Sequence, residues 1–75
     1  MSDAISDFMV HVEESLNPRQ LRALERDARR NPCVIGAAFP DRTPHLMMVV
    51  YDSECVRAKD ILERVRSTGV HASML

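Results

Sequence analysis

Residues 46–51 read Leu-Met-Met-Val-Val-Tyr, an apolar run that closes at Asp52 and constrains the fold more than any other stretch. The run is far too short to cross a bilayer, and its β-branched and aromatic residues favour a strand. A strand that is apolar throughout is buried on both faces. In a chain of 75 residues helices can cover one face, so we expect a partner to cover the other.

The composition indicates one small domain, residues 1–75, of ordinary globular type. The chain is 45% apolar and 28% charged with a net charge of −1, which does not favour binding to nucleic acid through bulk charge. The first seven residues, Met-Ser-Asp-Ala-Ile-Ser-Asp, lack the basic and apolar segments of a secretory signal. We therefore expect a cytoplasmic protein, and in that reducing compartment Cys33 and Cys55 are expected to be free thiols.

Periodicity and turn residues divide the chain into six elements. Alternating apolar residues at 8, 10 and 12 predict a strand, and Asn17-Pro18 predicts a helix start because Asn caps free amides and Pro fits the first helical position. Asn31-Pro32 ends that helix, Gly36 marks a bulge, and Gly69 supplies a left-handed cap after the second helix. The expected elements are a strand over 5–12, a helix over 18–30, a strand over 33–39, a five-residue loop over 40–44, a strand over 46–51, a helix over 58–65 and a strand over 70–75.

The order strand, helix, strand, strand, helix, strand predicts an α+β fold. It matches the ferredoxin-like βαββαβ sandwich, with a four-stranded antiparallel sheet and two helices on one face. Right-handed crossovers then give the spatial strand order 4-1-3-2. The run 46–51 becomes an interior strand, and the strand over 33–39 becomes an edge strand.

The stretch from Met48 to Ala72 resembles the heavy-metal-associated (HMA) domains, the family of copper chaperones and metal-ATPase N-terminal modules. The similarity lies in a strand ending in Tyr51-Asp52, a helix bearing Ile61, and Gly69 before a final strand. In addition, Leu21, Leu24 and Glu25 fall where the family's first helix carries apolar residues and an acid. The resemblance implies the HMA-like fold over nearly the whole chain.

The resemblance also implies a soft-metal site, a Met-x-Cys-x-x-Cys loop between the first strand and the first helix. Those three positions are Ser15, Asn17 and Gln20 in this chain. Amides and hydroxyls are poor ligands for Cu(I), which favours sulfur. We therefore expect no metal at the family loop and no resident cofactor there.

Two other groups of residues are candidate metal sites. The predicted topology places His11, His45 and His71 at one end of the sheet, with Glu13 or Glu14 nearby, a donor set that suits zinc. It places Cys33 and Cys55 at the opposite end, where they offer a two-thiolate copper site or a redox disulfide. The simpler readings are exposed, unrelated histidines and cysteines that act as small apolar residues.

Other activities find less support in the sequence. The chain has no glycine-rich phosphate loop, nucleophile elbow or zinc-helix motif, so we expect no catalytic residues and no enzyme. The family pattern turns Tyr51 inward, away from any RNA on the sheet. The arginines of the first helix are interleaved with Glu25 and Asp27 at intrahelical pairing distances, typical of a solvated face, with an anion-binding regulatory role as a weaker alternative.

The sequence thus favours a small non-enzymatic accessory or regulatory protein that acts by protein–protein interaction through its sheet face. Its predicted interface consists of Met9, Leu46, Met48 and Val50, which the family alignment leaves on the side away from the helices, and the partner is another protein or a second copy in a homodimer or larger oligomer. The methionines of the strands are interpreted as packing residues. The alternative is a metal-binding or metal-trafficking protein with a relocated copper or zinc site.

Overall fold

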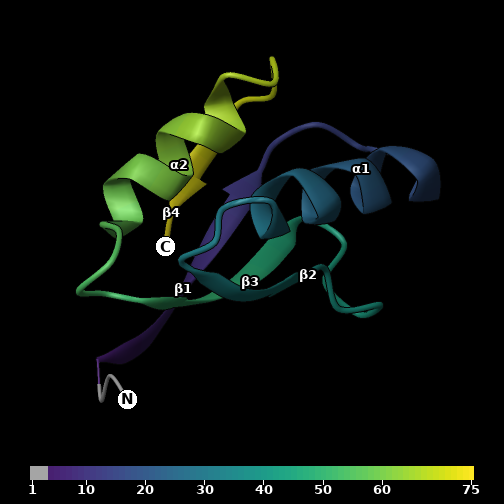
Figure 1. Cartoon of the computed structure of the whole chain (residues 1–75). Coiled ribbons are helices and arrows are strands. Elements are labelled where there is room, and N and C mark those ends of the chain that lie inside the picture. The colour runs from purple at the N-terminus through teal and green to yellow at the C-terminus, as the bar shows by residue number, and fades with distance from the viewer. Residues whose placement is uncertain (1–3) are drawn as a thin grey trace.

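The computed structural model describes residues 4–75 and forms one four-stranded antiparallel sheet. The elements are β1 (Ile5–Val12), α1 (Pro18–Arg29), β2 (Val34–Ala38), β3 (Leu46–Asp52), α2 (Ala58–Arg66) and β4 (Ala72–Met74). The strand order is β2-β3-β1-β4, and both helices lie on the same side of the sheet (Figure 1). The predicted fold class, strand order and interior position of the 46–51 run are confirmed.

The strands differ from prediction mainly at their ends. β4 covers only 72–74 instead of 70–75, because the His71 amide hydrogen bonds to the Glu14 carboxylate rather than to a strand. β2 begins after Cys33 and ends before Phe39, whose amide is bound by Glu25. The connection from β2 to β3 therefore runs over 39–45, longer than the predicted loop. The register of β2 on β3 shifts between Val34 and Gly36, which confirms the predicted bulge.

The first helix begins where the Asn17-Pro18 signal places it. The Asn17 side chain accepts from the Gln20 amide at 2.8 Å, and the Gln20 side chain accepts from the Asn17 amide at 2.9 Å. This reciprocal capping box satisfies two amides that a helix start leaves without partners. The helix ends at Arg29, just before Asn31-Pro32, and Gly69 after α2 has the left-handed φ of 103° that the sequence predicted.

The core lies between the sheet and the two helices. Its largest fully buried side chains are Met47, Val10, Val12, Val49 and Val65. Phe8 and Tyr51 also point to the helix side, with their rings edge to face at a centroid distance of 5.5 Å. Over the described residues 4–75, no helix is both long enough and apolar enough to cross a membrane.

Candidate functional site

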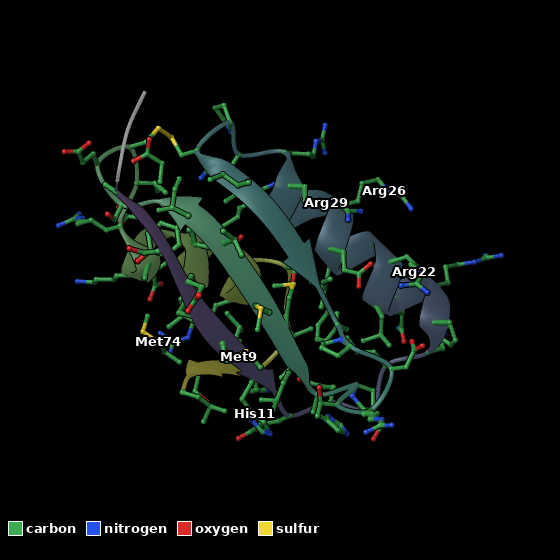
Figure 2. All side chains as sticks on the ribbon, turned by 90° about the horizontal axis from the view of Figure 1, so that it is seen from below. Met9, His11, Arg22, Arg26, Arg29 and Met74 are labelled. Carbon is green, nitrogen blue, oxygen red and sulfur yellow. A yellow bond between two sulfur atoms is a disulfide. The ribbon has the colours of Figure 1, made fainter. Side chains whose placement is uncertain are left out.

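The face of the sheet opposite the helices carries apolar side chains from its two interior strands. Along β3, Met47, Val49 and Tyr51 are buried, whereas Leu46 and Val50 are half-buried and Met48 is 45% exposed. Met9 of β1 lies directly opposite Met48 in the register, and facing residues of antiparallel strands point to the same side. Figure 2 shows this face from below, with Met9 on β1 beside β3.

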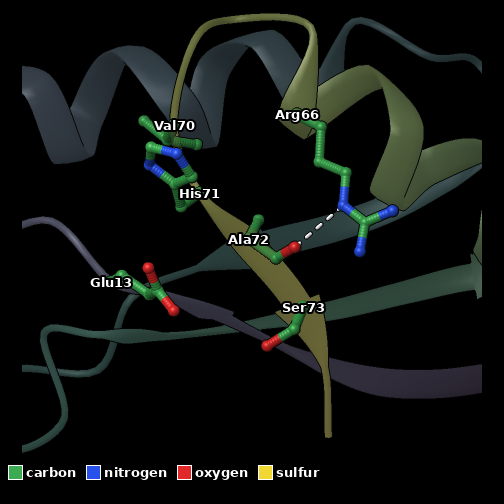
Figure 3. A pocket seen from close by; sticks show the side chains of 6 residues that line it. All are labelled: Glu13, Arg66, Val70, His71, Ala72 and Ser73. Atoms are coloured by element: carbon green, nitrogen blue, oxygen red, sulfur yellow. Dashed lines mark hydrogen bonds between the residues drawn. The ribbon is translucent and has the colours of Figure 1, made fainter.

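The two edges of the sheet are each closed by an arginine from the helix packed above them. Arg29 Nη1 of α1 donates to the Ala37 carbonyl of β2 at 3.4 Å. Arg66 Nε of α2 donates to the Ala72 carbonyl of β4 at 2.8 Å (Figure 3). Unpaired edge carbonyls are the groups by which a sheet recruits another strand, so these contacts disfavour edge-to-edge association. Neither role was predicted from the sequence.

The positions that the family resemblance assigns to a metal loop do not suit a soft metal. Asn17 and Gln20 use their side-chain oxygens in the capping box of α1, and Ser15 is exposed. The donors at this loop are hydroxyl and amide groups, which do not fit Cu(I). The spacing of Asn17 and Gln20 was itself a capping-box signal, although only the Asn17 half of it was predicted.

The three histidines occupy the same end of the sheet but do not gather into one site. The rings of His11 and His45 lie 6.2 Å apart between centroids. His45 Nδ1 lies 2.9 Å from the Val12 carbonyl, which can only accept, so Nδ1 donates this hydrogen bond. Within residues 4–75, no three His, Cys, Asp or Glu side chains are grouped to hold a metal ion. The predicted three-histidine zinc site is therefore not assembled here.

His71 is instead paired with Glu14. Its Nδ1 lies 2.7 Å from Glu14 Oε2, and its backbone amide donates to both carboxylate oxygens. The hydrogen bond to Glu14 raises the pKa of His71, and the bond to His71 lowers the pKa of Glu14. Figure 3 shows His71 beside a shallow hollow that also includes Glu13 and Val70.

At the opposite end of the sheet, Cys33 and Cys55 form a disulfide with a Cα–Cα distance of 5.5 Å. The prediction of free thiols is wrong for this structure, which contains no free cysteine among its described residues. The bond joins the turn before β2 to the turn between β3 and α2, where the antiparallel hairpin brings both segments together. Cys33 is half-buried and Cys55 is exposed, so neither is a core residue. Figure 2 shows the bond far from the labelled His11.

Glu25 is the one charged residue in the buried part of the described chain, with an exposure of 3%. Its Oε2 accepts from the Phe39 amide at 2.7 Å, and its Oε1 accepts from Arg22 at 3.3 Å. The carboxylate thus fastens the start of the 39–45 connection to α1. The predicted intrahelical pairing with an arginine is present, but the buried contact to Phe39 was not predicted.

Two of the four arginines of α1 make structural contacts. Arg22 binds Glu25 and Arg29 binds the edge of β2, as Figure 2 places them along the outer side of the helix. Asp27 was expected to pair within α1, but it binds Arg64 of α2 through two hydrogen bonds of 2.9 and 3.1 Å. This pair lowers the pKa of Asp27 and links the two helices. These contacts do not assemble an anion site.

No protein-family model matches the chain, and no curated protein sequence matches it. Solved structures do share its fold. A copper-binding domain from HMA7, a P-type ATPase, is 22% identical with a TM-score of 0.82, covering 92% of each chain. The putative copper-ion-binding protein from Bacillus anthracis str. Ames is 21% identical with a TM-score of 0.83, covering 96% of this chain and 100% of that one. Oxidized MerP from Ralstonia metallidurans CH34 is 11% identical with a TM-score of 0.82, covering 95% and 97%.

These identities are low, so the comparisons establish the fold and leave the chemistry to the residues of this chain. The predicted HMA-like ferredoxin fold is confirmed. The chain shares this scaffold, and it has a capping box at the start of α1 and a disulfide at the far end of the sheet.

Proposed function

We propose that this chain is a single-domain, non-enzymatic protein-interaction module that docks through the open face of its sheet. The observation that carries the proposal is the exposed apolar surface centred on Met48, an interior-strand residue that is 45% exposed. The outward side chains of this interior strand are apolar. Covering them with another surface removes apolar area from water, which lowers the free energy. Met9, Leu46 and Val50 extend this surface across β1 and β3.

The contacts at the sheet edges favour docking on the open face over strand addition at an edge. Arg29 and Arg66 bind the outward carbonyls of the two edge strands. Strand addition at either edge would have to break one of these bonds, whereas packing on the open face breaks none.

A second copy of the chain is the occupant that we propose. The net charge of −1 imposes little repulsion between copies. A domain of 75 residues buries only about 60% of its unfolded surface, so an additional apolar interface stabilises it. An isologous dimer would set Met48 of one copy against the same patch of the other. We propose a cytoplasmic location for this assembly.

The proposal assigns no metal to the loop formed by Ser15, Asn17 and Gln20. The copper-binding proteins that share the fold favour metal trafficking as the alternative function. In this chain such a role would require ligands elsewhere, and the cysteines supply the donors considered in the next subsection.

Sedimentation equilibrium of the full chain at micromolar to millimolar concentration tests the proposal. Met48→Lys is the test variant and Met74→Lys is the control. Met74 is similarly exposed, at 43%, but it pairs with the buried Val10 at the β4 edge and therefore does not belong to the open face. A lysine at the centre of a desolvated patch is expected to weaken self-association by at least about tenfold, and one at the edge to leave it within about twofold. A wild-type chain that remains monomeric, or a Met48→Lys variant that associates like wild type, contradicts docking of a second copy on this face.

A further inference from the structure

The Cys33–Cys55 pair lies on two turns that are held in place without the help of the sulfur atoms. The Asp52 amide donates to the Cys33 carbonyl at 2.9 Å, and the Cys33 amide donates to the Asn31 side chain at 2.9 Å. The Cys55 amide donates to the Asp52 carbonyl at 3.0 Å. These three bonds keep the two Cα atoms near their 5.5 Å separation when the disulfide is opened.

We propose that the reduced pair is a two-thiolate site for a soft monovalent cation, Cu(I), and that the disulfide is its metal-free, closed form. This inference goes beyond the proposed docking function and does not depend on it. Thiolates are the side chains that select Cu(I) over harder metals. The site would lie at the end of the sheet opposite Ser15, Asn17 and Gln20.

The number of available ligands distinguishes copper from zinc at this position. Structural zinc takes four ligands in a tetrahedron. No third His, Cys, Asp or Glu is grouped with the two cysteines for this purpose in the described part of the chain. A pair of thiolates alone suits a metal that accepts two ligands in line, as Cu(I) does.

The distances allow such a site after a small movement of the side chains. Two metal–sulfur bonds of roughly 2.3 Å placed in line separate the sulfur atoms by about 4.6 Å. A disulfide holds them about 2 Å apart, so the sulfurs must separate by roughly 2.5 Å. Rotation about the Cα–Cβ bonds of an exposed Cys55 and a half-buried Cys33 supplies this separation without moving the backbone.

The N-terminus of α2 lies next to Cys55 and favours negative charge there. Its N-cap residue, Arg57, makes no side-chain capping bond, in contrast to Asn17 at the start of α1. The partial positive charge of a helix start stabilises a nearby thiolate. Arg57 and Lys59 add positive charge in the same segment, while Asp52, Glu54 and Asp60 add negative charge, and Asp60 pairs with Arg57 at 3.2 Å.

Opening of the disulfide consumes two equivalents of a cellular monothiol and transfers two electrons to the protein. A thiolate attacks Sγ of the exposed Cys55, and Cys33 leaves as a thiolate. A second thiolate attacks the mixed disulfide at the small-molecule sulfur, Cys55 leaves, and the monothiol disulfide is released. Binding of Cu(I) to the two cysteines then releases whatever protons they hold.

Anaerobic titration of the full chain with Cu(I) against bicinchoninate, a chromophoric Cu(I) chelator, tests the proposal. The protein is reduced with a phosphine, and the oxidised protein is titrated in parallel. Reduced wild type is expected to withdraw one Cu(I) per chain from the chelator, and oxidised wild type none. Cys33→Ser and Cys55→Ser are each expected to weaken binding by at least about a hundredfold, because one of two ligands is lost.

Reduced wild type is the proper reference for folding, since it lacks the disulfide just as the serine variants do. Asn17→Ala, at the other end of the sheet, and Met48→Lys, on the open face, are expected to bind Cu(I) like reduced wild type. Failure of reduced wild type to compete, equal binding by the serine variants, or one Cu(I) shared by two chains in native mass spectrometry would overturn the proposal. None of these outcomes bears on self-association through Met48.

Discussion

The two ends of the sheet are held together by different chemistry. At one end, a covalent bond between Cys33 and Cys55 joins the turn before β2 to the turn before α2. At the other end, hydrogen bonds do the joining: Glu25 binds Phe39, the capping box starts α1, and Glu14 binds His71. The end that corresponds to the metal loop of HMA domains therefore has its side chains committed to structure, whereas the opposite end carries the sulfur.

This difference makes the end held by the Cys33–Cys55 bond dependent on redox conditions and the hydrogen-bonded end insensitive to them. The following variants alter the two ends in turn, and the expected losses of stability fall from one to the next.

Replacement of both cysteines by serine is expected to have the largest effect on the oxidised protein. The disulfide closes a loop across a sequence separation of 22 residues, and the chain-entropy estimate for a loop of that size is about 3 kcal/mol. Urea unfolding of oxidised wild type, reduced wild type and the C33S/C55S variant measures it. The variant is expected to match reduced wild type, and an equal stability of oxidised and reduced wild type would show that the bond does not hold this end.

Glu25→Leu is expected to cost about 2 kcal/mol of unfolding free energy. The substitution leaves the Phe39 amide without its acceptor in a buried position, and such an unsatisfied group costs about 1–3 kcal/mol. Glu25→Gln is the matched variant, because its amide oxygen still accepts from Phe39, and it is expected to lose less than half as much. If the two variants unfold at the same urea concentration, the hydrogen bond to Phe39 does not fasten the hairpin connection.

The fold followed from the sequence because local signals agreed with one another. Asn17-Pro18 and Asn31-Pro32 bounded α1, and the alternation in 5–12 and the run 46–51 placed the two interior strands. Once the sequence of strands and helices was known, the rule that crossovers are right-handed allowed only one spatial order of the strands. The orientation of Met47, Val49 and Tyr51 toward the helices followed from the period of a strand.

The contacts at the two ends did not follow, because they join residues far apart in the chain. Glu14 meets His71 across 57 positions, and Glu25 meets Phe39 across 14. No helix or strand periodicity in the sequence predicts contacts between residues so far apart. The cysteines were predicted to lie at the same end of the sheet, but their bonding was predicted from the expected compartment, and the structure contradicts it. Whether the open face is an interface stays a prediction.

Asn17→Ala is expected to cost about 1 kcal/mol, the usual loss for removal of a helix N-cap side chain. The change removes the acceptor for the Gln20 amide at the start of α1. Arg57→Ser tests the equivalent position of α2, which makes no side-chain capping bond, and is expected to stabilise the protein by up to about 1 kcal/mol. Thermal unfolding followed by circular dichroism measures both, and an Asn17→Ala variant as stable as wild type would show that the capping box does not stabilise α1.

His71→Gln is expected to have the smallest effect, and its dependence on pH identifies the cause. The pKa of His71 is raised above its ordinary value of 6.5, so its contribution is complete below pH 6.5 and is lost as the pH rises through the folded pKa. The pKa of Glu14 is lowered below its ordinary value of 4.5, so its contribution is present above pH 4.5 and is lost as the pH falls through the folded pKa. The pair therefore stabilises the fold most between pH 4.5 and 6.5. His71 is exposed and the Glu14 side chain is 34% exposed, so solvent screens the pair, and the difference in melting temperature between wild type and His71→Gln should be only on the order of a degree within this window. The difference should shrink toward zero as the pH rises through the raised pKa of His71. A difference that is the same at pH 5.5 and pH 8 would assign the effect to packing of the ring instead of its charge.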